Sequence, residues 1–212
     1  MRRHSWGKYL LLLLLLLAVA GCRKGDDQSI AFQESFDDPR GGWPSGQTPE
    51  FTYGYGDKDY SIAVQTPNWF GWATPGRQFA DVSIEVDVRP APDSQDGHFG
   101  VLCRHVNVRN FYYFAISDDG YYAIFRRLDG GPLTLLNWGG GMLPSQAIRP
   151  GGESNHLLAV CQGDELSFYI NGELVAIVND DALARGDIGL GAGSGPDGLT
   201  HALFDDLLVS RP

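Results

Sequence analysis

The chain of 212 residues contains 26 acidic and 16 basic side chains and carries a formal net charge of −10 at pH 7. Because an acidic surface is repelled by phosphate groups, we expect no nucleic-acid partner and no electrostatic attachment to anionic lipids. The 28 glycines and 12 prolines favour many short segments joined by tight turns.

The first segment, residues 1–21, is typical of a secretory signal peptide. Arg2, Arg3 and Lys8 precede the unbroken apolar run Leu10–Ala20. This run is shorter than the roughly 20 residues that a membrane-spanning helix requires. A basic lead followed by a short apolar core is the pattern of a cleaved export signal.

The end of this segment, Val19-Ala20-Gly21-Cys22, resembles the bacterial lipobox. The resemblance implies cleavage before Cys22, acylation of its thiol and stable attachment to a membrane, since two or three acyl chains anchor a protein firmly. Residues 22–29 would then form a lipidated polar tether. We therefore expect the protein in a bacterial cell envelope, on the extracytoplasmic side of a membrane. The alternative is an ordinary signal that has a cysteine there by chance.

The rest of the chain alternates with the period of β-strands and shows no long helical period. In Asp81–Arg89, valine and isoleucine side chains alternate with polar ones, which predicts a strand with one solvated face. Phe111–Phe125 predicts a hairpin that turns at Asp119-Gly120 and has large apolar groups on both faces.

Three further segments complete the pattern. Leu166–Val178 predicts a second hairpin, which turns at Asn171-Gly172, and Thr200–Ser210 predicts the last strand. The one helical candidate is a single turn over Asp180–Gly186. We expect an all-β domain over residues 30–212, built as two packed sheets or a barrel.

Cys103 and Cys161 remain after lipidation of Cys22, and both lie in strand-like runs. An oxidising compartment allows them to form a disulfide. The alternative is two buried free thiols, because free cysteine is commonly found in protein interiors.

Several segments together resemble the concanavalin A-like lectin/glucanase jelly roll, especially its laminin G-like and family-16-like members. These segments are FQESFDDPRGGW, GVLCRHVNVRNFYYFAISDDGYYAIFRR, SNHLLAVCQGDELSFYINGELVAIV, GDIGLGAGS and FDDLLVS. The resemblance implies a two-sheet antiparallel β-sandwich with six or seven strands in each sheet and the first strand beside the last. It also implies a concave face where relatives bind sugars.

Relatives with this fold hold one structural Ca²⁺ between the first and last strands. Glu34 and Asp205, or Asp206 in its place, fall near the corresponding positions. Because Ca²⁺ takes six to eight oxygen ligands, this pair alone gives an incomplete site. The resemblance thus implies a possible calcium ion and no other cofactor.

The family-16 glucanases carry catalytic carboxylates as Glu-x-Asp-x-Glu on one strand face. Here Glu85 and Asp87 have that spacing, but Arg89 stands at the third position. Because glycoside hydrolysis needs a pair of carboxyl groups in defined roles, the sequence predicts no catalytic residues. An atypical glycoside hydrolase remains an alternative.

Exposed aromatic rings are the candidate binding groups, since a flat ring can cover the apolar face of a sugar. Trp69 and Trp72 lie beside glycine and proline, so we expect them in a loop, and Trp138 precedes three glycines. Arg104 and Tyr113 could face a concave groove. Burial of the tryptophans as rim packing is the alternative. The sequence favours a non-catalytic module that binds glycan or another envelope polymer; the other readings are a structural or protein-interaction lipoprotein and the hydrolase.

Overall fold

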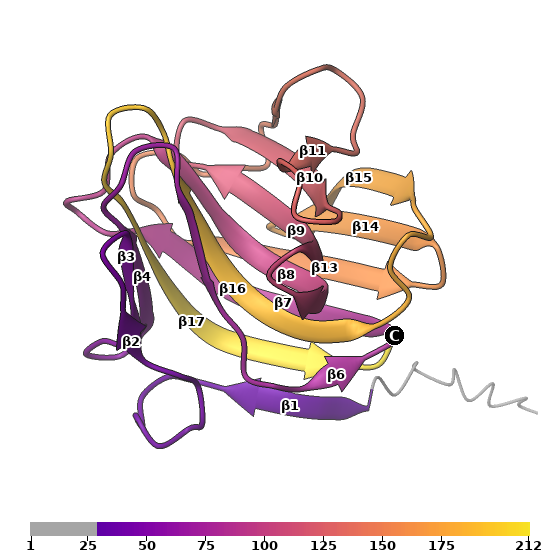
Figure 1. Cartoon of the computed structure of the whole chain (residues 1–212), viewed down its shortest axis with the longest axis horizontal. Helices are drawn as coiled ribbons and strands as arrows, with labels where there is room; N and C mark the ends of the chain where they lie inside the picture. The colour runs from indigo at the N-terminus through magenta and orange to yellow at the C-terminus, as the bar shows by residue number, and fades with distance from the viewer. Residues whose placement is uncertain (1–28) are drawn as a thin grey trace, which may run out of the picture.

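The structure, a computed structural model, describes residues 29–212 (Figure 1). All regular elements of this part of the chain are β-strands. None of its segments forms a helix that could cross a bilayer. The predicted signal peptide, Cys22 and the tether up to residue 28 lie outside the described residues.

The larger of two antiparallel sheets has nine strands. Their order is β15 (Glu173–Asn179), β14 (Glu165–Ile170), β13 (Asn155–Gln162), β7 (Val82–Pro90), β17 (Thr200–Ser210), β4 (Tyr60–Val64), β3 (Phe51–Tyr55) and β2 (Gly46–Gln47), with β1 (Ile30–Glu34) beside β17. The first and last strands are therefore neighbours, as the family resemblance implies (Figure 1).

The smaller sheet has eight strands. Their order is β11 (Thr134–Leu135), β10 (Tyr121–Arg127), β9 (Asn110–Ser117), β8 (Gly97–Asn107), β16 (Gly186–Ser194) and β5 (Phe70–Ala73), with β12 (Leu143–Pro144) beside β10 and β6 (Gln78–Phe79) beside β16. Figure 1 shows β16, β8 and β9 lying across β17, β7 and β13.

The core lies between the sheets and follows from the alternation of side chains along the strands. In β7, Val82, Ile84, Val86 and Val88 are buried, whereas Glu85 and Asp87 reach the solvated face. The predicted all-β, two-sheet antiparallel sandwich is thus confirmed.

Three local predictions differ from the structure. Residues 180–185 form a loop without a helical turn, because Asp180 and Leu183 bond to the Tyr112 hydroxyl and not to each other. The segment around Trp72, expected as a loop, contains strand β5. The sheets have nine and eight strands rather than six or seven, partly because the two-residue strands β2, β6, β11 and β12 extend their edges.

A disulfide joins Cys103 of β8 to Cys161 of β13. Both residues are fully buried in the core cluster between the sheets. The bond therefore links the two layers of the sandwich covalently.

Candidate functional site on the outer face of the smaller sheet

The outer face of the smaller sheet carries its own apolar layer, separate from the core. Along β9, Tyr112, Phe114 and Ile116 point into the core, whereas Phe111 and Tyr113 point to the outer face. The other members of this outer layer are Leu102, Ala115, Ala123 and Phe125, with Phe70, Trp72, Leu133, Leu135 and Met142 packed against them. The predicted two-sided burial of this hairpin is confirmed.

Glycines in β16 make room for rings on this face. A Cβ atom at Gly191 would lie 2.8 Å from the Phe70 Cζ atom, and one at Gly193 would lie 2.3 Å from the His98 ring. The rings of Phe70 and His98 therefore occupy the space that larger residues in β16 would fill.

The rings pack on one another across the strands. Phe70 stacks on Trp72 at 5.5 Å and on Phe111 at 5.8 Å, and its centroid is 4.6 Å from that of Tyr113. Such offset aromatic contacts stabilise a fixed arrangement of rings. This aromatic layer fixes the side chains that border two hollows on the face.

The first hollow, which we call the tryptophan groove, has a volume of about 570 Å³. It is lined by Phe51, Asn68, Trp69, Phe70, Trp72, Val108, Arg127, Gly131, Pro132 and Leu133. Trp69 is 44% exposed, and Trp72 is partly buried beside it. The groove thus combines open aromatic surface with two polar groups, Asn68 and Arg127.

Backbone hydrogen bonds hold Trp69 at the groove. Its N–H donates to Ser194 Oγ at 3.1 Å, and its carbonyl accepts from the Ser194 N–H at 2.9 Å. The neighbouring Asn68 has a φ of 54° and donates its N–H to the Gly195 carbonyl. Asparagine tolerates this left-handed conformation better than most residues. The segment is therefore fixed to the end of β16.

The second hollow, which we call the His98 pocket, has a volume of about 340 Å³. It is lined by Asp96, Gly97, His98, Ser117, Asp119, Tyr121, Met142, Ser194 and Gly195. His98 Nδ1 lies 3.1 Å from the Tyr113 hydroxyl, which donates to the Gly191 carbonyl, so Nδ1 is the donor in this pair.

Burial lowers the pKa of the His98 imidazole to about 4, from an ordinary value of 6.5. The unfolded chain therefore binds more protons at this site than the folded chain between pH 6.5 and pH 4. Stability falls in any pH range where the unfolded state binds more protons than the folded state. We therefore expect His98 to lower the free energy of unfolding by about 2–3 kcal/mol as the pH drops through that range. Denaturant unfolding at a series of pH values measures it.

The matched comparison is His98→Gln, which removes the titrating group. Between pH 7 and pH 4, the free energy of unfolding of the variant should fall by about 2–3 kcal/mol less than that of the wild type. All other acid-sensitive groups are the same in the two proteins, so the difference reports on His98. Parallel stability curves for the two proteins would show that His98 is not held neutral by burial.

The structure separates the predicted binding residues. Trp69 and Trp72 share the tryptophan groove. Trp138 is 92% exposed but lines neither hollow. Tyr113 lies on the predicted face, but its side chain is fully buried within the aromatic layer, against Phe70. Tyr113 thus lies on the outer face, as predicted, and a role for it in ligand binding stays a prediction.

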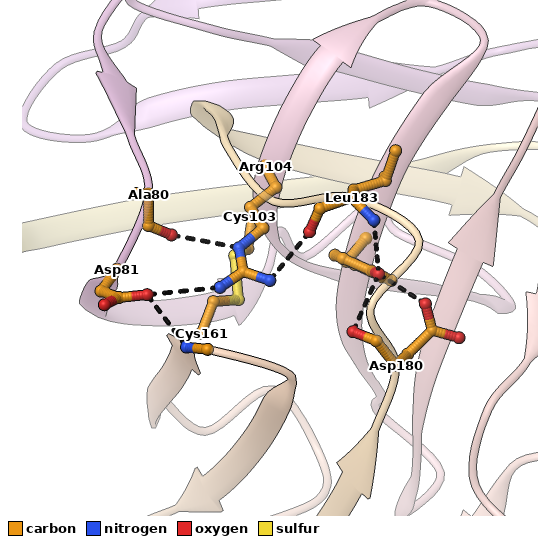
Figure 2. Close-up of a disulfide and its surroundings, with 9 residues drawn as sticks. Ala80, Asp81, Cys103, Arg104, Cys161, Asp180 and Leu183 are labelled. Carbon is orange, nitrogen blue, oxygen red and sulfur yellow. Dashed lines mark hydrogen bonds and ion pairs between the residues drawn. A yellow bond between two sulfur atoms is a disulfide. The ribbon is translucent and has the colours of Figure 1, made fainter.

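The prediction that Arg104 could face the groove is wrong, because its side chain lies in the interior. Its φ is 50°, and the pairing of β8 with β9 shifts register between Cys103 and Asn107. The side chain is therefore buried next to the disulfide, as Figure 2 shows. Its Nε donates to the Ala80 carbonyl and its Nη1 to the Leu183 carbonyl. Arg104 holds two loops together and does not reach the outer face.

Glu34 and Asp205, the predicted calcium ligands, are engaged locally. Glu34 accepts the Phe36 N–H at 3.0 Å, and Asp205 accepts the Asp206 N–H at 2.8 Å. Burial raises the pKa of Asp205, and the charges of Asp206, Asp37 and Asp87 raise it further. Within residues 29–212, no three acidic, histidine or cysteine side chains gather as metal ligands. Because Ca²⁺ also takes backbone carbonyl oxygens as ligands, a calcium ion at this place stays a prediction.

The glucanase-like carboxylates lie on the other sheet. His156 Nδ1 is 2.7 Å from Asp87 Oδ1, and Nε2 is 3.3 Å from Glu85 Oε2, so one imidazole lies between both acids. These residues occupy the solvated face of the larger sheet. They therefore contribute nothing to the tryptophan groove or the His98 pocket.

The tryptophan groove also contains Phe70, Asn68 and Arg127, which were not predicted from the sequence. Every second residue of β10 lies on the same face of the sheet, which groups Ala123, Phe125 and Arg127. This alternation could have been recognised from the sequence. Which of the two faces is the outer one follows only from the packing of the sheets.

No family model matches the chain, and no significant match was found among curated proteins. Solved structures with a similar fold include the carbohydrate-binding module CBM66 from Bacillus subtilis, which is 14% identical with a TM-score of 0.60 over 86% of this chain and 97% of that one. A Bacillus subtilis protein of unknown function with a galectin-like fold is 13% identical, with a TM-score of 0.63 over 86% and 96%.

A third similar structure comes from work on endo-acting O-glycanases of human gut microbiota. It is 10% identical, with a TM-score of 0.60 over 87% of this chain and 100% of that one. At such identities the similarity defines the fold alone. The chain therefore has the antiparallel β-sandwich that also occurs in galectin-like proteins, carbohydrate-binding modules and glycoside hydrolases.

Proposed function

We propose that this domain binds glycans without cleaving them, while lipid on Cys22 holds it on the extracytoplasmic side of a bacterial membrane. The observation that carries the proposal is the tryptophan groove, where open indole surface lies beside Asn68 and Arg127. An aromatic ring covers the apolar face of a pyranose, and a few polar groups fix its orientation. Solved neighbours that include a carbohydrate-binding module support the ligand class.

The chemistry of the groove supports binding over catalysis. None of the residues that line the tryptophan groove is a carboxylic acid. Glycoside hydrolysis by the usual route needs two carboxyl groups, about 5–9.5 Å apart. The groove can therefore orient a sugar, but it has no acid or nucleophile of that kind to attack it.

We expect Trp69→Ala to weaken glycan binding about tenfold, because the substitution removes a ring that stacks on the sugar. A glycan array on residues 22–212 identifies the best ligand, and isothermal titration then measures its affinity for wild type and variant. Trp138→Ala is the matched control, since Trp138 is exposed but lines neither hollow. Equal unfolding midpoints for all three proteins exclude a folding defect.

The other outcomes discriminate among the alternatives. Unchanged affinity in Trp69→Ala would remove the groove as the binding site. A silent array, together with an envelope protein that co-purifies, would favour a protein-interaction lipoprotein. Cleavage of a bound glycan would favour a hydrolase, and Asp96 and Asp119 of the His98 pocket would then be the first carboxylates to replace.

A further inference from the structure

The charge of the tryptophan groove is opposite to that of the whole chain. The chain has a formal net charge of −10, and 26 of its residues are acidic. The groove nevertheless contains a single charged residue, Arg127, and no acidic one. A cation placed on aromatic surface in an otherwise acidic protein selects for ligands that bring their own negative charge.

Arg127 forms no ion pair with an acidic residue of the described range, 29–212. Arg40, Arg89, Arg104 and Arg126 each form an ion pair with an aspartate. In residues 29–212 Arg127 forms no such pair, and its one hydrogen bond runs from Nε to the Gly131 carbonyl at 3.0 Å. This bond fixes the guanidinium at the groove and leaves both Nη atoms free to donate.

The loop beside Arg127 forms no ion pair with it among the described residues. Asp129, the acidic residue of this loop, uses its backbone: its carbonyl accepts from Arg109 Nη2, and its N–H donates to Asn110 Oδ1. Its exposed carboxylate forms no ion pair within the described part of the chain. Arg109 adds a second positive charge next to the groove residue Val108.

We propose that the tryptophan groove binds an acidic saccharide, in which the sugar ring stacks on Trp69 and a carboxylate accepts hydrogen bonds from Arg127. This inference rests on the proposed glycan-binding function and names its ligand class. A guanidinium presents two parallel N–H donors that match the two oxygens of a carboxylate. The rings beside it cover the apolar face of the same sugar unit.

The test compares ligands that differ only in charge. Oligogalacturonates and oligoglucuronates are titrated into residues 22–212. Their methyl esters, in which each carboxyl group is esterified and uncharged, are titrated in parallel. We expect the charged forms to bind about tenfold more tightly, and added salt to reduce this difference. Poly(glycerol phosphate), a chain that is anionic but lacks sugar carboxylates, separates phosphate recognition from carboxylate recognition.

The variants assign the effect to Arg127. Arg127→Gln should lose about tenfold in affinity for the acid and less than twofold for the ester, whereas Arg127→Lys should lose less for the acid. Arg185→Gln is the control for net charge, because Arg185 is exposed and lines neither hollow. Equal binding of acid and ester, or tighter binding of poly(glycerol phosphate), would overturn the inference but leave glycan binding standing. Binding of no saccharide at all would overturn both.

Discussion

Loss of the Cys103–Cys161 disulfide should lower the free energy of unfolding by about 4 kcal/mol. The bond closes a loop with a sequence separation of 58 residues, and a cross-link of that length removes much conformational entropy from the unfolded chain. Both cysteines are fully buried between the sheets, so their replacement also removes core contacts. Urea unfolding of Cys103→Ala/Cys161→Ala beside the wild type measures the change.

Reductant provides the control for this prediction. The unfolding midpoint of the wild type should fall in dithiothreitol toward that of the double variant, whereas the midpoint of the double variant should not move. A loss below about 1 kcal/mol, or an equal response of both proteins to reductant, would mean that the cross-link does not hold the sheets together.

The disulfide matters for the site because of where its loop runs. The segment between the cysteines contains β9 and β10, and these strands supply Phe111, Tyr113 and Arg127 to the outer face. Reduction should therefore loosen the groove before it affects strands outside the loop. An oxidising compartment would preserve this bond and, with it, the arrangement of the strands that line the groove.

The fold could be predicted from the sequence because its signals are local. Alternation marked β7 and the hairpin of β9 and β10, and glycine-containing turns marked their ends. These patterns involve residues that are close together in the chain, so they can be recognised without knowledge of the tertiary packing. The family resemblance supplied the remaining step, namely that the first and last strands pair.

The candidate site was less predictable because it depends on departures from regular geometry. Simple alternation after Leu102 and Cys103 would place Arg104 on the outer face. A positive φ and a shift in register turn it into the interior instead. Such an irregularity redirects side chains without a clear mark in the sequence.

The glycines of β16 give a second example. The segment GDIGLGAGS is typical of a strand. What matters for the site is the space that its glycines leave on the outer face of the sheet. Phe70 and His98 come from distant parts of the chain and fill this room. Because these contacts are long-range, the local sequence pattern could not show that Tyr113 would be covered, or that Arg127 would form no ion pair within residues 29–212.

Replacement of Cys22 should release the protein from the membrane almost completely. Cleavage before Cys22 would remove three basic residues and no acidic one, so the mature chain would be more acidic than the −10 of the whole sequence. Anionic lipid headgroups repel such a surface, and electrostatic attraction cannot substitute for acyl chains. In Cys22→Ala, expressed in a bacterium with an ordinary cleavable export signal in place of residues 1–21, we expect the protein to move from the membrane fraction to the soluble fraction.

Two measurements make this prediction decisive. The wild-type N-terminal peptide should begin at Cys22 and carry the mass of a diacylglycerol thioether, and Lys24→Gln should behave as the wild type because it retains the acylated thiol. An unmodified wild-type mass would contradict the lipobox reading directly. Membrane retention of Cys22→Ala would instead mean that some other part of the protein holds it there, and the groove would then be the first surface to test for binding to an envelope polymer.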